Sequence, residues 1–149
     1  MANGWWRAAS NITDLADYFG SIPHAELMLC VARRVSDKAL LHLIKQWLVA
    51  PVEERDERGH VRRTTRNKDT KRGTPQGAPI SPLLANLYMR RFVLGWKTLG
   101  HQARFQARIV NYADDFVILC RRQANEALTT MRDMMRRIKL TVNETKTHV

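Results

Sequence analysis

Apolar residues recur at helical spacing in four stretches of the chain. The pattern predicts a helix after Pro23, a second from the N-capping Ser36 to before Pro51, a third over residues 81–94 and a fourth over residues 123–139. Each stretch carries an apolar stripe, which is typical of a helix that covers another layer of the fold.

Two further runs are rich in strand-forming residues. Residues 107–112 and 116–120 are joined at Ala113-Asp114-Asp115, which predicts a hairpin with both carboxylates at its tip. A short strand-like start followed by a turn lies within residues 11–21, and an extended tail covers residues 140–149. This order of elements predicts an α+β fold in which helices back an antiparallel sheet.

The composition restricts the class of protein. A length of 149 residues suits one domain, and 44% hydrophobic residues are enough for a core, so global disorder is excluded. No run approaches the ~18–20 apolar residues that span a bilayer, and the first ten residues lack a secretory signal, so we expect no membrane partner. Cys30 and Cys120 form no disulfide framework, which favours a reducing cytoplasm.

The charge is large and uneven. With 25 Lys and Arg against 14 Asp and Glu, the net charge of +11 predicts a polyanionic partner, first of all a nucleic acid. Residues 50–72 form a charge-dense basic loop or hairpin around Gly59. No Asp or Glu occurs over residues 70–113, and this stretch ends at Asp114-Asp115. The pair is either a turn on a solvated face or part of a site.

Two adjacent carboxylates repel each other and raise each other's pKa unless a cation lies between them. Mg²⁺ is the natural cation, because it prefers hard oxygen ligands and usually binds one or two carboxylates together with substrate phosphates. A two-metal phosphoryl-transfer site also needs a carboxylate from an adjacent strand. Asp14 is the candidate, and Asp17 is the alternative, which we expect to point another way.

Four segments resemble the motifs of one family, in that family's order. They are DLADYF with IPH (residues 14–19 and 22–24), GTPQGAPISPLLANLY (73–88), YADDFVIL (112–119) and LTVNETKT (140–147). The third resembles the signature hairpin of reverse transcriptases. The others are similar to the first aspartate motif, the loop and helix, and the palm-closing lysine motif of group II intron reverse transcriptases, also called maturases. The resemblance implies an RNA-directed DNA polymerase with a palm-like sheet.

The resemblance implies a metal site and substrates. Asp14 and Asp114 would hold two Mg²⁺ ions, replaceable by Mn²⁺, with Asp115 as the supporting carboxylate. The implied substrates are dNTPs, an RNA template and a DNA or RNA primer, and intron RNA is a further implied partner.

The resemblance also assigns contacts to the substrates. Phe19 would exclude ribonucleotides by its bulk, Gln76 and Gly77 would line the incoming nucleotide, Lys146 would approach the triphosphate, and Tyr112 would pack beneath the primer terminus. Without the motifs, the two aromatic residues would be interpreted as core, the glutamine as a turn residue and the lysine as solvated.

Two residues beside these motifs stand apart from the assigned contacts. His24 is interpreted as structural or helix-starting, because no second His or Cys lies at ligand spacing. Gly20 stands where the family usually carries Asp.

The resemblance covers the palm alone. Family members have fingers before the first aspartate and a thumb after the lysine motif, so we expect residues 1–149 to be a palm fragment that lacks most of the fingers and all of the thumb. The segment LLANLY (residues 83–88) favours the intron lineage, with a CRISPR-associated enzyme as the alternative. The alternative functions are a non-catalytic RNA-binding module and an inactive truncated fragment. The sequence does not indicate the oligomeric state.

Overall fold

The computed structural model describes residues 9–55, 59–75, 77–112 and 115–147. For several residues within strands, including those of the first strand, it describes the backbone alone. The chain divides into two compact units. The first, here the sheet unit, consists of Met1–Ala16 and Met89–Val149, and the second, here the insert unit, is Asp17–Tyr88.

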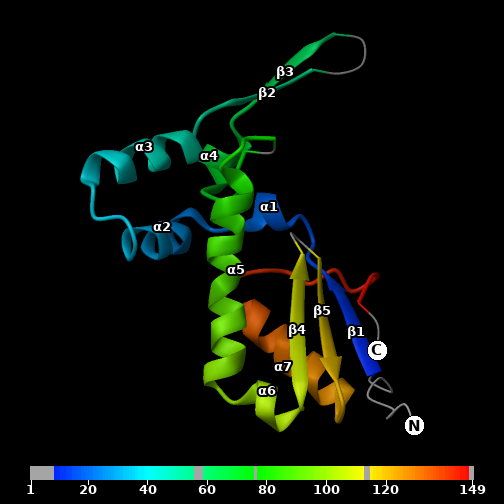
Figure 1. The fold of residues 1–149 in the computed structure, drawn as a ribbon. Coiled ribbons are helices and arrows are strands. Elements are labelled where there is room, and N and C mark those ends of the chain that lie inside the picture. The colour runs from blue at the N-terminus through cyan, green and yellow to red at the C-terminus, as the bar shows by residue number, and fades with distance from the viewer. Residues whose placement is uncertain (1–8, 56–58, 76, 113–114, 148–149) are drawn as a thin grey trace. The chain divides into compact units, whose positions relative to one another are not determined.

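The sheet unit contains a three-stranded antiparallel sheet in the order β1-β5-β4 (Figure 1). Its strands are β1 (Ala9–Asp14), β4 (Ala107–Tyr112) and β5 (Asp115–Cys120). The two predicted strands and the hairpin that joins them are confirmed, and β1 supplies the predicted strand-like start two residues earlier than expected.

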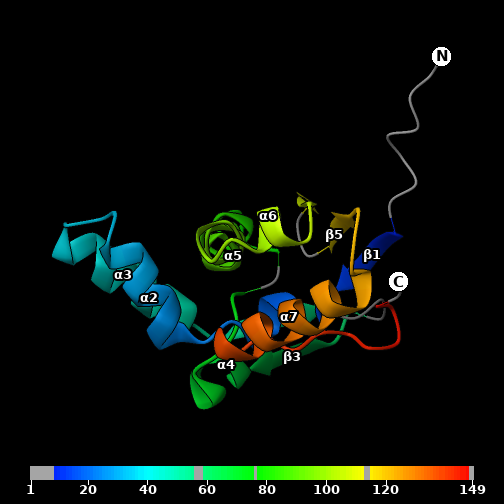
Figure 2. The ribbon, with the colours of Figure 1, turned by 90° about the horizontal axis from the view of Figure 1, so that it is seen from below.

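Helices cover one face of this sheet. Phe116, Ile118 and Cys120 alternate along β5 as fully buried residues, and the ring of Phe116 lies 5.4 Å from that of Phe92. Helix α7 (Ala124–Arg137) lies behind the sheet in the view of Figure 1, as the view from below shows (Figure 2). Its buried residues are Ala127, Leu128, Met131 and Met135.

Helix α5 (Ser81–Thr98) is longer than the predicted helix over residues 81–94. Residues 81–88 belong to the insert unit and residues 89–98 to the sheet unit. Gly95 lies inside the helix, and a Cβ atom there would lie 3.1 Å from the Met134 side chain of α7. The absence of a side chain therefore permits a close approach of the two helices.

An aromatic cluster closes the sheet unit at the start of β4. Trp96 packs on Phe105 and on His101 of the short helix α6 (His101–Arg104), and the Arg104 guanidinium lies 4.9 Å from the Phe105 ring centre. Burial, and then the positive charge of Arg104, lower the pKa of His101.

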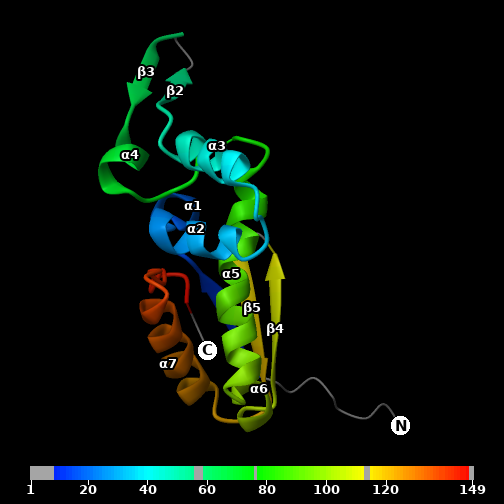
Figure 3. The same ribbon diagram turned by 90° about the vertical axis from the view of Figure 1, so that its left-hand side faces the viewer.

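The insert unit is mainly helical. Helix α1 (Tyr18–Ser21) is a single turn where the sequence predicted a bend, and α2 (His24–Ala32) and α3 (Lys38–Leu48) lie side by side (Figure 3). The prediction that Ser36 caps α3 was wrong. Asp37 is the cap, because its carboxylate accepts hydrogen bonds from the amides of Ala39 and Leu40 at 2.7 and 3.1 Å.

The charge-dense part of the insert unit forms a two-stranded hairpin of β2 (Val52–Arg55) and β3 (Val61–Thr64). The hairpin projects beyond α3 and is followed by the short helix α4 (Arg66–Thr70) (Figure 1). With two antiparallel sheets and packed helices, the fold is α+β, as predicted. No helix in the described part of the chain is long and apolar enough to cross a membrane.

Candidate active site

The register of the sheet aligns two of the predicted carboxylates. Asp14 ends β1, Asp115 begins β5, and the two are direct Cα partners. On the other side of Asp115, its partner in β4 is Tyr112. Positions directly opposite each other in antiparallel strands lie on the same face. Positions 14, 115 and 112 therefore form one row across the end of the sheet, here the carboxylate row.

This row lies on the face opposite the helices. Phe116 is buried against the helical layer, so the period-two alternation of a strand places position 115 on the other face, where Asp115 is exposed. The next row on this face contains Val110, a residue that is 57% exposed, and Val117. The same alternation that builds the core thus presents Asp115 to solvent.

The donor set of the row fits a hard divalent cation. Two carboxylates directly opposite each other in a sheet destabilise it through like-charge repulsion, and a cation between them removes that cost. Asp114 lies outside the described residues, and only the backbone of Asp14 and Tyr112 is described. Among the side chains that the structure does describe, no three His, Cys, Asp or Glu residues form a group that could hold a metal ion.

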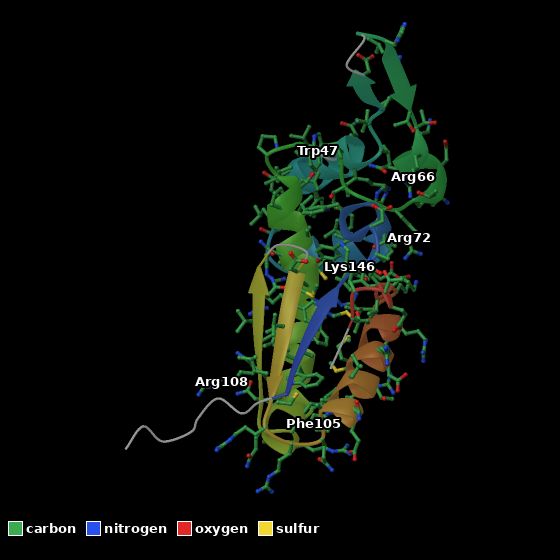
Figure 4. The ribbon with its side chains drawn as sticks, turned by 90° about the vertical axis from the view of Figure 1, so that its right-hand side faces the viewer. Trp47, Arg66, Arg72, Phe105, Arg108 and Lys146 are labelled. Atoms are coloured by element: carbon green, nitrogen blue, oxygen red, sulfur yellow. The ribbon has the colours of Figure 1, made fainter. Side chains whose placement is uncertain are left out.

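Lys146 lies in the C-terminal segment at the same end of the sheet unit as this row (Figure 4). A β-bridge between Leu15 and Val142, and a 3.0 Å hydrogen bond from the Ala16 amide to the Thr141 carbonyl, hold this segment beside the end of β1. The predicted extended tail is confirmed only at the bridge of Val142, and turns follow it. The turns form because polar groups of Asn143, Thr145 and Thr147 hydrogen-bond to one another.

Two local contacts fix the turns around Lys146. The Asn143 side chain accepts hydrogen bonds from the amide and the hydroxyl of Thr145. Arg132 of α7 forms a two-point ion pair with Glu144. Lys146 itself is exposed. In contrast, Arg108 and Phe105 lie at the far end of the sheet (Figure 4).

In the insert unit, Phe19 is joined to the glycine-containing loop that precedes α5. The Thr74 amide donates to the Phe19 carbonyl at 2.7 Å, and the Gly73 amide donates to the Ile22 carbonyl at 2.7 Å. The ring of Phe19 is half-buried and lies 5.7 Å from the ring of Tyr18. Residues far apart in the sequence are thereby brought together.

The same loop is tied to the start of α5. The Ser81 hydroxyl donates to the Pro75 carbonyl at 2.5 Å. Gly77 has a φ of +79° and is exposed, with open space where a side chain would begin, so that a ligand can approach its backbone closely. Gln76 lies outside the described residues.

Asp17, the alternative to Asp14, has a different environment. It belongs to the insert unit, its φ is +44°, and its carboxylate forms an ion pair with Arg66 at 2.9 Å. The Asp17 carboxylate also occupies the space that a side chain at Gly20 would need. This contact gives a physical reason for the glycine that departs from the family pattern.

Sequence reasoning did not identify the contact made by His24. The residue is only 9% exposed, and its Nε2 atom lies 2.7 Å from the Gly73 carbonyl oxygen. The partner is 49 residues away, and no spacing pattern within the chain indicates such a pair.

Comparison with known proteins gives a consistent result. A family model described as "Reverse transcriptase (RNA-dependent DNA polymerase)" matches residues 10–149. A 91 kDa protein in the cob intron of Schizosaccharomyces pombe is 31% identical over 87 residues, which is 58% of this chain and 9% of that protein. A protein named for COX1/OXI3 intron 2 of Saccharomyces cerevisiae is 32% identical over 76 residues, 51% of this chain and 8% of that protein.

Solved structures show the same fold. Apo telomerase from Candida tropicalis, truncated from the C-terminal domain, superposes with a TM-score of 0.66 at 16% identity, over 93% of this chain and 30% of that one. The chain therefore spans less than a third of this structure, and the alignments span less than a tenth of the two intron proteins. At this identity the likeness shows a shared α+β fold.

Proposed function

The chain belongs to the reverse transcriptase (RNA-dependent DNA polymerase) family, and on that premise we propose that it forms the catalytic palm of an RNA-directed DNA polymerase. The pairing of Asp14 with Asp115 at the end of the sheet is the observation that carries this proposal. It supports a site in which Asp14 and Asp114 would hold the metals, with Asp115 as the supporting third carboxylate.

In this proposal Asp14, Asp114 and Asp115 hold two Mg²⁺ ions, or Mn²⁺ in their place. When bound, the metals supply Lewis-acid activation of the primer 3′-hydroxyl and neutralise charge on the triphosphate. Pairing of β1 with β5 fixes the backbone positions of Asp14 and Asp115, which limits the reorganisation required during the reaction. Asp115 is exposed on the face away from the helices, where a primer terminus has access.

The remaining assigned residues bind and orient the substrates. The half-buried Phe19 ring limits space at the sugar 2′-position, and Gln76 and Gly77 contact the incoming nucleotide. Lys146 is exposed and carries the proton that the departing pyrophosphate accepts. Tyr112, one step along the carboxylate row from Asp115, supports the primer terminus.

We also propose the intron lineage for this chain. The motif GTPQGAPISPLLANLY is the feature that favours it, and two relatives are proteins of the cob and COX1/OXI3 introns. The partners would then be intron RNA and an RNA template, which suit a chain of net charge +11. Both described cysteines are free and buried, in keeping with a cytoplasmic location.

Primer extension on an RNA template tests the proposed activity. The full-length protein should incorporate dNTPs in the presence of Mg²⁺, and Asp114→Ala or Asp115→Ala should remove incorporation. Asp133→Ala is the matched control, because Asp133 is an exposed carboxylate of the same unit that pairs with Arg136 on α7. Incorporation that survives the two active-site substitutions would contradict the assignment.

The same assay separates the proposal from its alternative. The charge of +11 also suits a non-catalytic RNA-binding module, whose affinity would fall steeply with salt. Salt-sensitive RNA binding without metal-dependent incorporation by the full-length protein would favour that module over the polymerase.

A further inference from the structure

His24 begins α2 and is buried, and its ring also makes a polar contact. Nε2 lies 2.7 Å from the carbonyl oxygen of Gly73. A carbonyl oxygen can only accept, so Nε2 carries the hydrogen and donates it. The ring thus makes a polar contact to the backbone of the loop that precedes α5.

The peptide of Gly73 is held from several directions. Its amide donates to the Ile22 carbonyl at 2.7 Å, and its carbonyl accepts from His24. Its φ is +89°, and a Cβ atom there would lie 3.0 Å from the Gly20 carbonyl oxygen. The loop therefore passes so close to the α1 segment that a side chain at position 73 does not fit without a shift.

The bonds on either side connect this peptide to residues with proposed roles. Next to Gly73, the Thr74 amide bonds to the Phe19 carbonyl, and Pro75 is bonded by Ser81. The residue after Pro75 is Gln76. Because Gly73 is buried, loss of the His24 ring would remove the hydrogen bond that its carbonyl accepts, and an unsatisfied buried carbonyl is costly.

We infer that His24 is a positioning residue for the incoming nucleotide. Its ring fixes the backbone of residues 73–75, and through it the spacing between Phe19 and Gly77. The identity of the ligand, a deoxynucleoside triphosphate, rests on the proposed function, whereas the positioning of the loop rests on the contacts above. His24 does not touch the substrate.

A pair of similar substitutions tests this inference. The side-chain nitrogen of Gln takes a place near that of Nε2 and reaches Gly73, whereas the shorter Asn places its nitrogen near Nδ1 and does not. We expect His24→Asn to raise the KM for dNTP about tenfold, equivalent to ~1.4 kcal/mol, to change kcat less, and to increase ribonucleotide incorporation. His24→Gln should stay within about twofold of the unchanged protein, a difference of ~0.4 kcal/mol.

A second readout does not depend on activity. Amide hydrogen exchange of residues 73–77, measured by mass spectrometry on the full-length protein, should be faster in His24→Asn and unchanged in His24→Gln. His42→Asn, an exposed histidine of α3, is the control for the substitution itself. Urea unfolding of all variants separates loop release from general destabilisation.

The outcomes are distinguishable. Faster exchange in His24→Asn alone, in a protein without polymerase activity, would sustain the positioning role and overturn the proposed function. Equal exchange and equal KM in the Asn and Gln variants of an active polymerase would overturn the inference and leave the function standing. Equal loss of global stability in both variants would also overturn it, because His24 would then be a residue of the core only.

Discussion

The two units hold their candidate functional residues by different means. In the sheet unit, strand register sets the positions: Asp14, Asp115 and Tyr112 are aligned because β1, β5 and β4 pair as they do. In the insert unit, individual hydrogen bonds between an irregular loop and the α1 segment set them. A sheet spreads its stability over many contacts, whereas the loop depends on a few.

The largest expected effect is a loss of stability of the sheet unit on substitution of Phe116. Phe116 is 1% exposed and follows Asp115 directly in β5. Its replacement by Ala would leave a cavity against Phe92 and lower the free energy of unfolding by about 3–5 kcal/mol. Urea denaturation measures the loss, with Val110→Ala on the exposed face expected to stay within about 0.5 kcal/mol. A small loss for Phe116→Ala would mean that β5 is not anchored as described.

The second-largest expected effect is a loss of stability of the insert unit on substitution of Gly73. Gly73→Ala would place a Cβ atom against the Gly20 backbone at a φ of +89°, so we expect a loss of about 2–3 kcal/mol. Gly59→Ala is the matched control, because φ there is +80° but the space is open, and it should cost only about 1 kcal/mol. Equal losses in thermal unfolding would show that the close approach at Gly73 contributes nothing.

A smaller loss of stability is expected at the start of α3 in the insert unit, where one side chain caps the helix. Asp37→Ala removes the cap of α3 and should lower stability by about 1 kcal/mol, whereas Ser36→Ala should leave it nearly unchanged. Chemical denaturation of both variants gives the difference directly. A larger loss for Ser36→Ala would reinstate the cap that the sequence predicted.

The smallest expected effect is a loss of stability of the sheet unit at acid pH, caused by His101. Burial and Arg104 lower the pKa of His101, so the folded state binds a proton less readily than the unfolded state, whose histidine titrates near its usual value of about 6.5. The contribution of this group is therefore present above that pH and is lost as the pH falls below it.

Unfolding measured between pH 8 and pH 5.5 tests the His101 effect. His101→Gln should lose slightly less stability over this range than the unchanged protein, with His42→Gln as the control for removal of a histidine. A steeper loss in His101→Gln would reverse the sign of the argument.

These differences explain what the sequence could predict. Residues 107–112 and 116–120 are rich in strand-forming residues, which is a local property, so the hairpin could be predicted. The exposed face of Asp115 could not, because residues 116–120 are apolar throughout and only the burial of Phe116 shows which face is covered. Helices α4 and α6 were not predicted, because four or five residues show no periodicity. The contacts of Gly73 with Ile22 and His24 depend on an approach of distant segments that only the folded backbone supplies.

The candidate site, like the fold, has parts that the sequence could predict and parts that it could not. Carboxylate chemistry indicated Asp14, Asp114 and Asp115 as candidates, and motif resemblance gave them roles and added the other five residues. The register then aligned Asp14, Asp115 and Tyr112. Gln76 and Asp114 lie outside the described residues, so their roles stay predictions. The ion pair of Asp17 with Arg66 could not be predicted, because charges 49 residues apart have no fixed spacing.

We propose that Asp14, Asp114 and Asp115, and not Asp17 of the insert unit, support metal-dependent nucleotide addition. The most direct measurement compares Asp14→Asn with Asp17→Asn in single-nucleotide incorporation by the full-length protein with Mg²⁺. We predict that Asp14→Asn abolishes incorporation and that Asp17→Asn retains it, because Asp17 pairs with Arg66. Loss of incorporation in Asp17→Asn with retention in Asp14→Asn would contradict the account.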